Sequence, residues 1–187
     1  MTPPARRTAV IGSVLVASLM AAVLAGMGRL WWCKCGSPVP WAFDTWSTHN
    51  SQHILDPYVL SHVLHGVVFF AVLGWLHRRR AEVAWLVALT VEAGWEILEN
   101  TPLVINRYRE TTASLDYFGD SIANSEADLV ACGVGYLIAA RLPWWGAVLL
   151  FVGLELISVL WIRDSLLLNV LMLLSPVDAV RDWQMGG

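Results

Sequence analysis

The chain has 187 residues, of which 57% are hydrophobic and only 14% are charged. This composition excludes an ordinary soluble domain of this length and indicates a single transmembrane domain that covers residues 1–187. The formal net charge of −3 excludes the strongly basic surface that nucleic-acid binding requires. Membrane lipids are therefore the expected partners, and nucleic acid is not.

Five apolar segments have the roughly 20 residues that a helix needs to cross a bilayer. In chain order they cover residues 8–29, 57–76, 81–98, 121–140 and 142–162. The first follows Arg6 and Arg7 as in a signal peptide, but its length predicts an anchor that stays in the mature protein. A last apolar run within 165–180 is short and contains Asn169, which leaves open a sixth span, a re-entrant piece or an interfacial helix. The predicted fold class is an all-α, polytopic membrane helix bundle of five or six transmembrane helices.

The arginines predict which side of the membrane each loop faces, because cytoplasmic loops are enriched in Lys and Arg. The residues that fall on one side are Arg6, Arg7, Arg78, Arg79, Arg80, Arg141 and, if there are six spans, Arg181. The three consecutive arginines in the very short connection at residues 78–80 are the strongest evidence for which side is cytoplasmic. We expect a cytoplasmic N-terminus, with the loops 31–56 and 99–120 on the outer side.

Three glutamates interrupt the third apolar segment. Glu92, Glu96 and Glu99 follow the i, i+4, i+7 spacing that places side chains on one face of a helix. A carboxylate in hydrocarbon costs at least a few kcal/mol, so aligned carboxylates must meet partners, water or protons inside the bundle. This face marks the expected functional site.

The depth of each residue below the outer surface can be counted from the outer end of its helix, at about 1.5 Å of rise per residue. By this count, polar residues of two neighbouring segments lie at the same depth as these glutamates. A first layer would contain His62, Glu96 and Asn124, and a deeper layer would contain His65, Glu92 and Asp128. The residues expected at the rim are Asp56, Glu99, Asp116 and Asp120. The agreement of three helix faces predicts a His/Glu/Asp pocket that opens to the outer side.

The first functional hypothesis is an enzyme that acts on a lipid or a lipid-linked substrate. A divalent metal (Zn, Mn or Fe) suits mixed imidazole and carboxylate ligands, and the predicted ligands are His62, His65, Glu96 and Asp128. The candidate catalytic residues are Glu92, Glu96, Glu99, Asp120 and Asn124, with Glu92 or Glu99 as general base. Arg107, Arg109 and Arg163 would bind a phosphate headgroup, although contact with ordinary lipid phosphates explains them equally well.

Other functional readings remain open. The same acids could perform metal-free acid–base catalysis, relay protons or cations in a transporter, or form an interhelical network in a structural or accessory protein. The pair Cys33-Lys34-Cys35 could oxidise or bind a soft metal, but two ordinary cysteines beside the membrane edge are the favoured reading.

Three motifs carry a resemblance to a known family. They are Asp56-Pro57-Tyr58 with Ser61-His62-Val63-Leu64-His65-Gly66, Glu92-Ala93-Gly94-Trp95-Glu96 through Pro102, and Asp116-Tyr117-Phe118-Gly119-Asp120 through Ser125. With Arg163-Asp164 and Asn169, they resemble an uncharacterised family of alphaproteobacterial inner-membrane proteins. The resemblance implies a multi-pass protein of the bacterial inner membrane and no assigned activity. More distantly, the chain resembles VanZ-like membrane proteins, where Asp128 departs from the small residue expected.

Overall fold

The computed structural model describes residues 2–112 and 116–186, which form eight α-helices. These are α1 (Pro3–Gly26), α2 (Val59–Arg79), α3 (Ala81–Glu99), α4 (Pro102–Thr111), α5 (Ile122–Ala139), α6 (Trp144–Ile162), α7 (Leu166–Leu174) and α8 (Asp178–Gln184). The prediction of an all-α helix bundle is confirmed.

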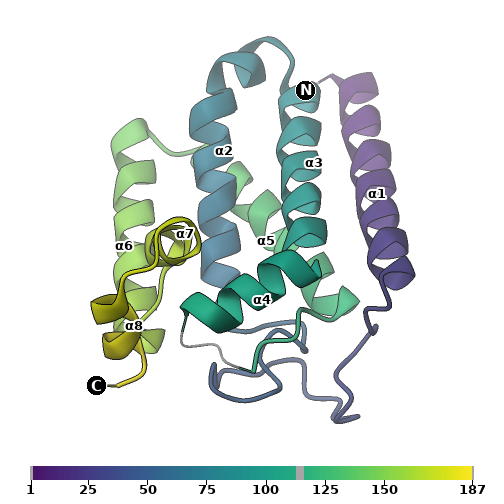
Figure 1. Cartoon of the computed structure of the whole chain (residues 1–187). Coiled ribbons are helices and arrows are strands. Elements are labelled where there is room, and N and C mark those ends of the chain that lie inside the picture. Colours follow the sequence, from purple (N-terminus) through teal and green to yellow (C-terminus); the bar gives the residue numbers. More distant parts are fainter. Residues whose placement is uncertain (1, 113–115, 187) are drawn as a thin grey trace.

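The five long helices α1, α2, α3, α5 and α6 run up and down beside one another, and α4 crosses one end of the bundle (Figure 1). The N-terminus and the short α2–α3 and α5–α6 connections lie at the opposite end from α4. The long loop 27–58 lies at the same end as α4 (Figure 1). We call these the short-loop end and the long-loop end.

Within the described part of the chain, three helices, α1, α2 and α6, are long and apolar enough to span a membrane. Helices α3 and α5 have similar lengths of 19 and 18 residues, but both contain buried acids, which lower their hydropathy. The predicted number of five or six spans therefore stays a prediction. Among the long helices, α6 has the least buried surface, with Ser158 as its single buried residue. Its apolar side chains are available to lipid around most of its circumference.

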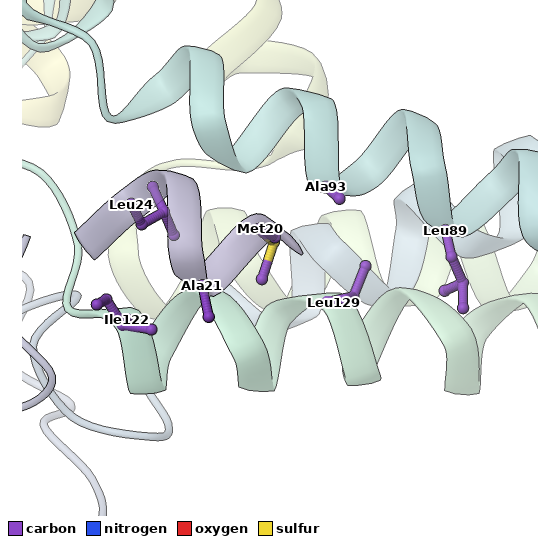
Figure 2. Close-up of a cluster of buried hydrophobic side chains, with 7 residues drawn as sticks. All are labelled: Met20, Ala21, Leu24, Leu89, Ala93, Ile122 and Leu129. Carbon is purple, nitrogen blue, oxygen red and sulfur yellow. The ribbon is translucent and has the colours of Figure 1, made fainter. Parts of the chain in front are cut away.

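Apolar packing joins α1, α3 and α5. Figure 2 shows the buried cluster, which consists of Met20, Ala21, Leu24, Leu89, Ala93, Ile122 and Leu129. Small alanines at two of the contact positions allow the helices to approach closely. This cluster fixes α3 and α5 relative to each other on the side that faces α1.

Helices α2 and α5 approach more closely still, through a glycine on each. A Cβ atom added to Gly66 would lie within 3.0 Å of the Cys132 carbonyl oxygen, and one added to Gly135 would lie within 3.0 Å of the Val63 carbonyl oxygen. Each glycine thus lets its helix rest on the backbone of the other. The contact fixes the position of the stretch of α2 around Val63, which includes His62 and His65.

Helix α4 lies in the segment expected to be an outer loop. Pro102 is its first residue, where a missing N–H costs nothing, and it follows the end of α3 at Glu99. Ile105, Tyr108 and Thr111 are buried at a three-residue spacing, so the helix lies with one face on the bundle. Helix α4 therefore covers part of the long-loop end of the bundle, next to the cavity that is described below.

The C-terminal segment forms two short helices instead of one long one. Helix α7 has 9 residues, a length of about 14 Å, which is less than half of a typical hydrocarbon core. Arg163, just before α7, donates a 3.0 Å hydrogen bond to the carbonyl oxygen of Trp183 in α8. The end of α8 therefore lies beside the residue that precedes α7. The C-terminus lies at the long-loop end (Figure 1).

Candidate functional site

A cavity of about 300 Å³ lies between α2, α3, α5 and α7, under the loops of the long-loop end. Its polar lining consists of Asn50, Ser51, Asp56, Tyr58, Ser61, His62, His65, Glu92, Glu99, Tyr108, Tyr117, Asp120, Asn124, Asp128 and Asn169. Its apolar lining consists of Phe69, Val91, Trp95, Leu166 and Val170. The lining thus combines many polar groups with an apolar group of side chains, as a site for an amphipathic molecule would.

His62 lies at the centre of the polar lining. Its Nδ1 atom is 2.7 Å from Glu92 Oε1 and 3.3 Å from Glu96 Oε1, and its Nε2 atom is 3.8 Å from Asp128 Oδ2. His65 Nδ1 lies 2.9 Å from Glu92 Oε2, so one carboxylate contacts both imidazoles. The two predicted layers therefore meet at His62, which contacts members of both.

Two groups of three side chains have the spacing of metal ligands. One ligand atom each from His62, His65 and Glu92 lies within 4.8 Å of the others, and the same holds for His62, Glu96 and Glu99. Glu92 and Glu96 are fully buried, with an exposed fraction of 0%. Both oxygens of Glu96 and Oδ1 of Asp128 lack a hydrogen-bond partner among the described residues. Buried carboxylate oxygens without donors are costly unless a cation or a proton joins them.

The rim of the cavity is an ordered hydrogen-bond network around Asp120. Tyr117 and the Asn100 amide each donate a 2.9 Å hydrogen bond to its carboxylate, and the Asp120 backbone N–H donates to the Asn100 side chain. Arg29 donates to the carbonyl oxygens of Phe118 and Asp120. Asp120 is thereby held as a hydrogen-bond acceptor in the lining of the cavity.

Asn124 lies deeper on α5, where Ser121 caps the helix by accepting from the Asn124 backbone N–H. The Asn124 amide donates to Asp56 Oδ2 at 3.4 Å. Asp56 in turn accepts from the backbone N–H of Tyr58, which orders the start of α2. Asn124 and Asp56 therefore connect α5 to the loop that enters α2.

The three arginines expected to bind a headgroup lie outside the lining of this cavity. Arg107 donates to the Leu173 carbonyl oxygen, Arg109 to the Tyr117 carbonyl oxygen and Arg163 to that of Trp183. Each guanidinium thus binds backbone at the long-loop end, and their role with a phosphate stays a prediction.

Sequence reasoning did not single out several residues that build the site. Tyr108 lines the cavity and donates a 2.9 Å hydrogen bond to Asn169, and Asn100 holds Asp120. Asn50 and Ser51 reach the cavity from the long loop. The available signal was the three-residue apolar spacing after Pro102, which identifies α4 as a helix and Tyr108 as inward-facing.

Burial makes Asp120 a source of pH-dependent stability. Desolvation is the main cause that raises its pKa from 3.8 to about 6, against the hydrogen bond from Tyr117. The folded state therefore holds this proton more tightly than the unfolded state. We expect the free energy of unfolding to fall as pH rises from about 4 to 6, and the contribution of Asp120 to this fall is on the order of 3 kcal/mol. Asp164, whose pKa burial also raises to about 6, adds a slope of the same sign.

Unfolding of the detergent-solubilised protein measured between pH 4 and pH 7 tests this prediction. Asp120→Asn should make the slope shallower, because it removes the titrating carboxyl group, and its stability relative to the wild type should rise toward pH 7, where Asp120 is ionised. A variant slope as steep as that of the wild type would show that Asp120 titrates normally.

The comparisons with known proteins agree on one family. The family model described as "Protein of unknown function (DUF2585)" matches residues 24–186. A "UPF0314 protein" of Sphingopyxis alaskensis is 45% identical over 97% of each chain, and one of Paracoccus denitrificans is 47% identical over 90% of each. "UPF0314 protein R03235" of Rhizobium meliloti is 52% identical over 86% of this chain and 82% of its own.

No solved structure matches the chain. None of the reported relatives is named as a VanZ-like protein, so that more distant resemblance stays a prediction. The resemblance to an uncharacterised alphaproteobacterial family is confirmed by both the family model and the relatives. The chain therefore belongs to the DUF2585 family, whose relatives in alphaproteobacteria carry the name UPF0314 protein.

Proposed function

We propose that this protein is a metal-dependent hydrolase or transferase of the bacterial inner membrane that acts on a lipid or a lipid-linked substrate. The observation that carries the proposal is the charge imbalance of the cavity. Five acidic side chains line it, Asp56, Glu92, Glu99, Asp120 and Asp128, whereas its described lining contains two histidines and no lysine or arginine. A divalent cation supplies the positive charge that such a cavity lacks.

The best-supported ligands are His62, His65 and Glu92. Their ligand atoms lie within 4.8 Å of one another, and two imidazoles with one carboxylate suit zinc, manganese or iron. Glu96 lies next to this set, 3.3 Å from His62, with both oxygens free of other donors among the described residues. We therefore assign Glu96 as a fourth ligand, and Asp128 lies 3.8 Å from the other ring nitrogen of His62.

The apolar part of the lining supports a lipid substrate. Val91 and Val170 line the cavity and are 51% and 44% exposed, so an apolar part of the cavity lining continues to the surface of the protein. Trp95 and Phe69 belong to the same apolar lining next to His65, with ring centroids 6.4 Å and 6.0 Å from its imidazole. An acyl chain that entered from the bilayer would lie on these side chains, with its polar group beside the acids.

The residues at the entrance fit acid–base roles. A bound metal would lower the pKa of a coordinated water and polarise an ester or phosphoryl oxygen. Glu99 lies between the ligand group and the rim, within 4.8 Å of His62 and Glu96 at their ligand atoms, which suits a general base. Asp120 and Asn124 provide hydrogen-bonding groups on the facing side for orienting the substrate.

The orientation that we propose follows the positive charges. Arg78, Arg79 and Arg80 lie at the short-loop end together with the N-terminus (Figure 1). Cytoplasmic placement of this end puts the cavity on the periplasmic side. Substrates of the outer leaflet would then have direct access to it.

Bound metal is the first test. Elemental analysis of the detergent-purified protein after metal-replete growth should find zinc, manganese or iron, and His65→Ala and Glu96→Gln should each lose about one equivalent relative to the wild type. His77→Ala is the matched control, because His77 lies on the same helix but contacts Tyr136 away from the cavity.

Loss of the same equivalent from the His77 variant, or wild-type metal content in both site variants, would contradict the proposal. The reaction class is then tested in proteoliposomes made from total inner-membrane lipid, with lipid products followed by mass spectrometry. The metal-loaded wild type should change a lipid species that His65→Ala leaves unchanged.

A further inference from the structure

A second group of metal-ligand side chains lies in the long loop, outside the cavity. Ligand atoms of Cys33, Cys35, His49 and His53 all lie within 4.8 Å of one another. The two cysteines are separated by one residue, and the two histidines by three, 14 residues further along the chain. None of the four lines the cavity described above. We propose that these four side chains form a structural zinc site.

The distances between the ligand atoms match one tetrahedral ion. Cys33 Sγ lies 3.3 Å from His49 Nδ1, and Cys35 Sγ lies 3.6 Å from His53 Nε2. Zinc bonds of about 2.3 Å to sulfur and about 2.0 Å to nitrogen, at tetrahedral angles, place these atoms roughly 3.5 Å apart. A Cys₂His₂ site contains four such sulfur–nitrogen pairs, and the two measured here, 3.3 Å and 3.6 Å, lie close to this value. A thiolate–imidazole pair for catalysis would use only one of them.

Neighbouring groups already orient the ligands. The Val39 carbonyl oxygen can only accept, so His53 must donate to it through Nδ1, which leaves the Nε2 lone pair directed at Cys35. The Trp32 ring packs edge-on against the same imidazole, with centroids 5.3 Å apart. The Cys35 backbone N–H donates to Cys33 Sγ at 3.3 Å, which fixes the position of this sulfur. These contacts hold His53 and Cys33 in place for binding a metal.

The site has a structural consequence for the cavity. Ser51 and Gln52 lie between the two histidines, and Ser51 has a left-handed backbone with φ of 58°. The Ser51 carbonyl oxygen accepts from the Ser121 N–H at 2.9 Å, and Gln52 donates to the Gly119 carbonyl oxygen at 2.6 Å. A zinc ion that joins the loop at positions 33–35 and 49–53 would hold these contacts at the entrance of the cavity.

X-ray absorption at the zinc edge of the purified full-length protein provides the test, because the cavity ligands contain no sulfur. In the His65→Ala variant, which lacks the proposed cavity metal, the expected first shell has two sulfur atoms at about 2.3 Å and two nitrogen atoms at about 2.0 Å. Replacing zinc with cobalt should add a sulfur-to-cobalt charge-transfer absorption. Both signals should disappear in the double variant Cys33→Ser/Cys35→Ser and in His53→Ala, and persist in the control Cys132→Ser.

These outcomes separate this site from the proposed cavity metal. Loss of sulfur-bound zinc in the cysteine variant should leave the His65-dependent equivalent in place, and His65→Ala should leave the sulfur ligation unchanged. The inference is overturned if zinc-replete protein shows no sulfur ligands, if Cys33 and Cys35 react fully as free thiols or form a disulfide, or if copper occupies the four ligands instead. Removal of zinc with a chelator should also make the loop 27–58 more sensitive to proteolysis.

Discussion

Replacing Gly135 with alanine is expected to force helices α2 and α5 apart and to lower the free energy of unfolding by about 3 kcal/mol or more. The added Cβ would overlap the Val63 carbonyl oxygen, which belongs to the backbone of α2 and has no side-chain rotamer through which to move away. Gly66→Ala should have a similar effect, since its Cβ would overlap the Cys132 carbonyl oxygen. Thermal unfolding of the detergent-solubilised variants measures both.

The matched control is Gly94→Ala, a third glycine within a long helix. A Cβ at Gly94 has no neighbour within 4 Å, and alanine has the higher helix propensity, so this variant should be as stable as the wild type or slightly more so. Equal stability of all three variants would show that α2 and α5 are not in backbone contact. A stable Gly135 variant with weakened metal binding would instead show that the helices separate without unfolding.

The second large effect is expected for Glu92→Gln. This carboxylate contacts His62 at 2.7 Å and His65 at 2.9 Å, so a neutral amide removes charge from two imidazole contacts at once while keeping the side-chain volume. As a ligand of the proposed metal, Glu92 should be essential, and divalent-ion affinity should fall at least about 100-fold, with turnover reduced to background. Isothermal titration with zinc or manganese, combined with the lipid assay, measures the loss.

Glu82→Gln is the control for this prediction, because Glu82 lies in the first turn of the same helix and outside the cavity. It should leave both metal affinity and turnover unchanged. The structural-network hypothesis predicts another pattern for Glu92→Gln, in which the melting temperature falls but no metal is lost because none was bound. Metal binding that survives in a well-folded Glu92 variant would contradict the ligand assignment.

Much of the architecture could be predicted from local pattern. The apolar segments are long, and their length alone indicates helices that cross or lie in a membrane. The i, i+4, i+7 spacing placed Glu92, Glu96 and Glu99 on one face, because the period of an α-helix depends only on its backbone. The same period places His62 and His65 on one face. The residues on each helix face could therefore be predicted without knowing how the helices pack.

Contacts between faces could not be predicted with the same precision. Depth counting separated His62 from Glu92 into different layers, whereas the structure places them 2.7 Å apart. Depth counting assumes parallel helices with known ends, and the crossing angle and relative height of two packed helices depend on their side chains, which the count does not contain. Helix α4 was missed because its helical signal is short and lies in a polar segment.

The sequence by itself determined the class of the protein, the apolar helices and the acidic face of α3, because composition and periodicity are properties of neighbouring residues. Only the tertiary structure decided which faces meet. It brought His62 between Glu92 and Asp128 from three helices, and it brought Cys33 beside His49 across a loop. Such contacts depend on helix packing and loop closure, which no local pattern specifies.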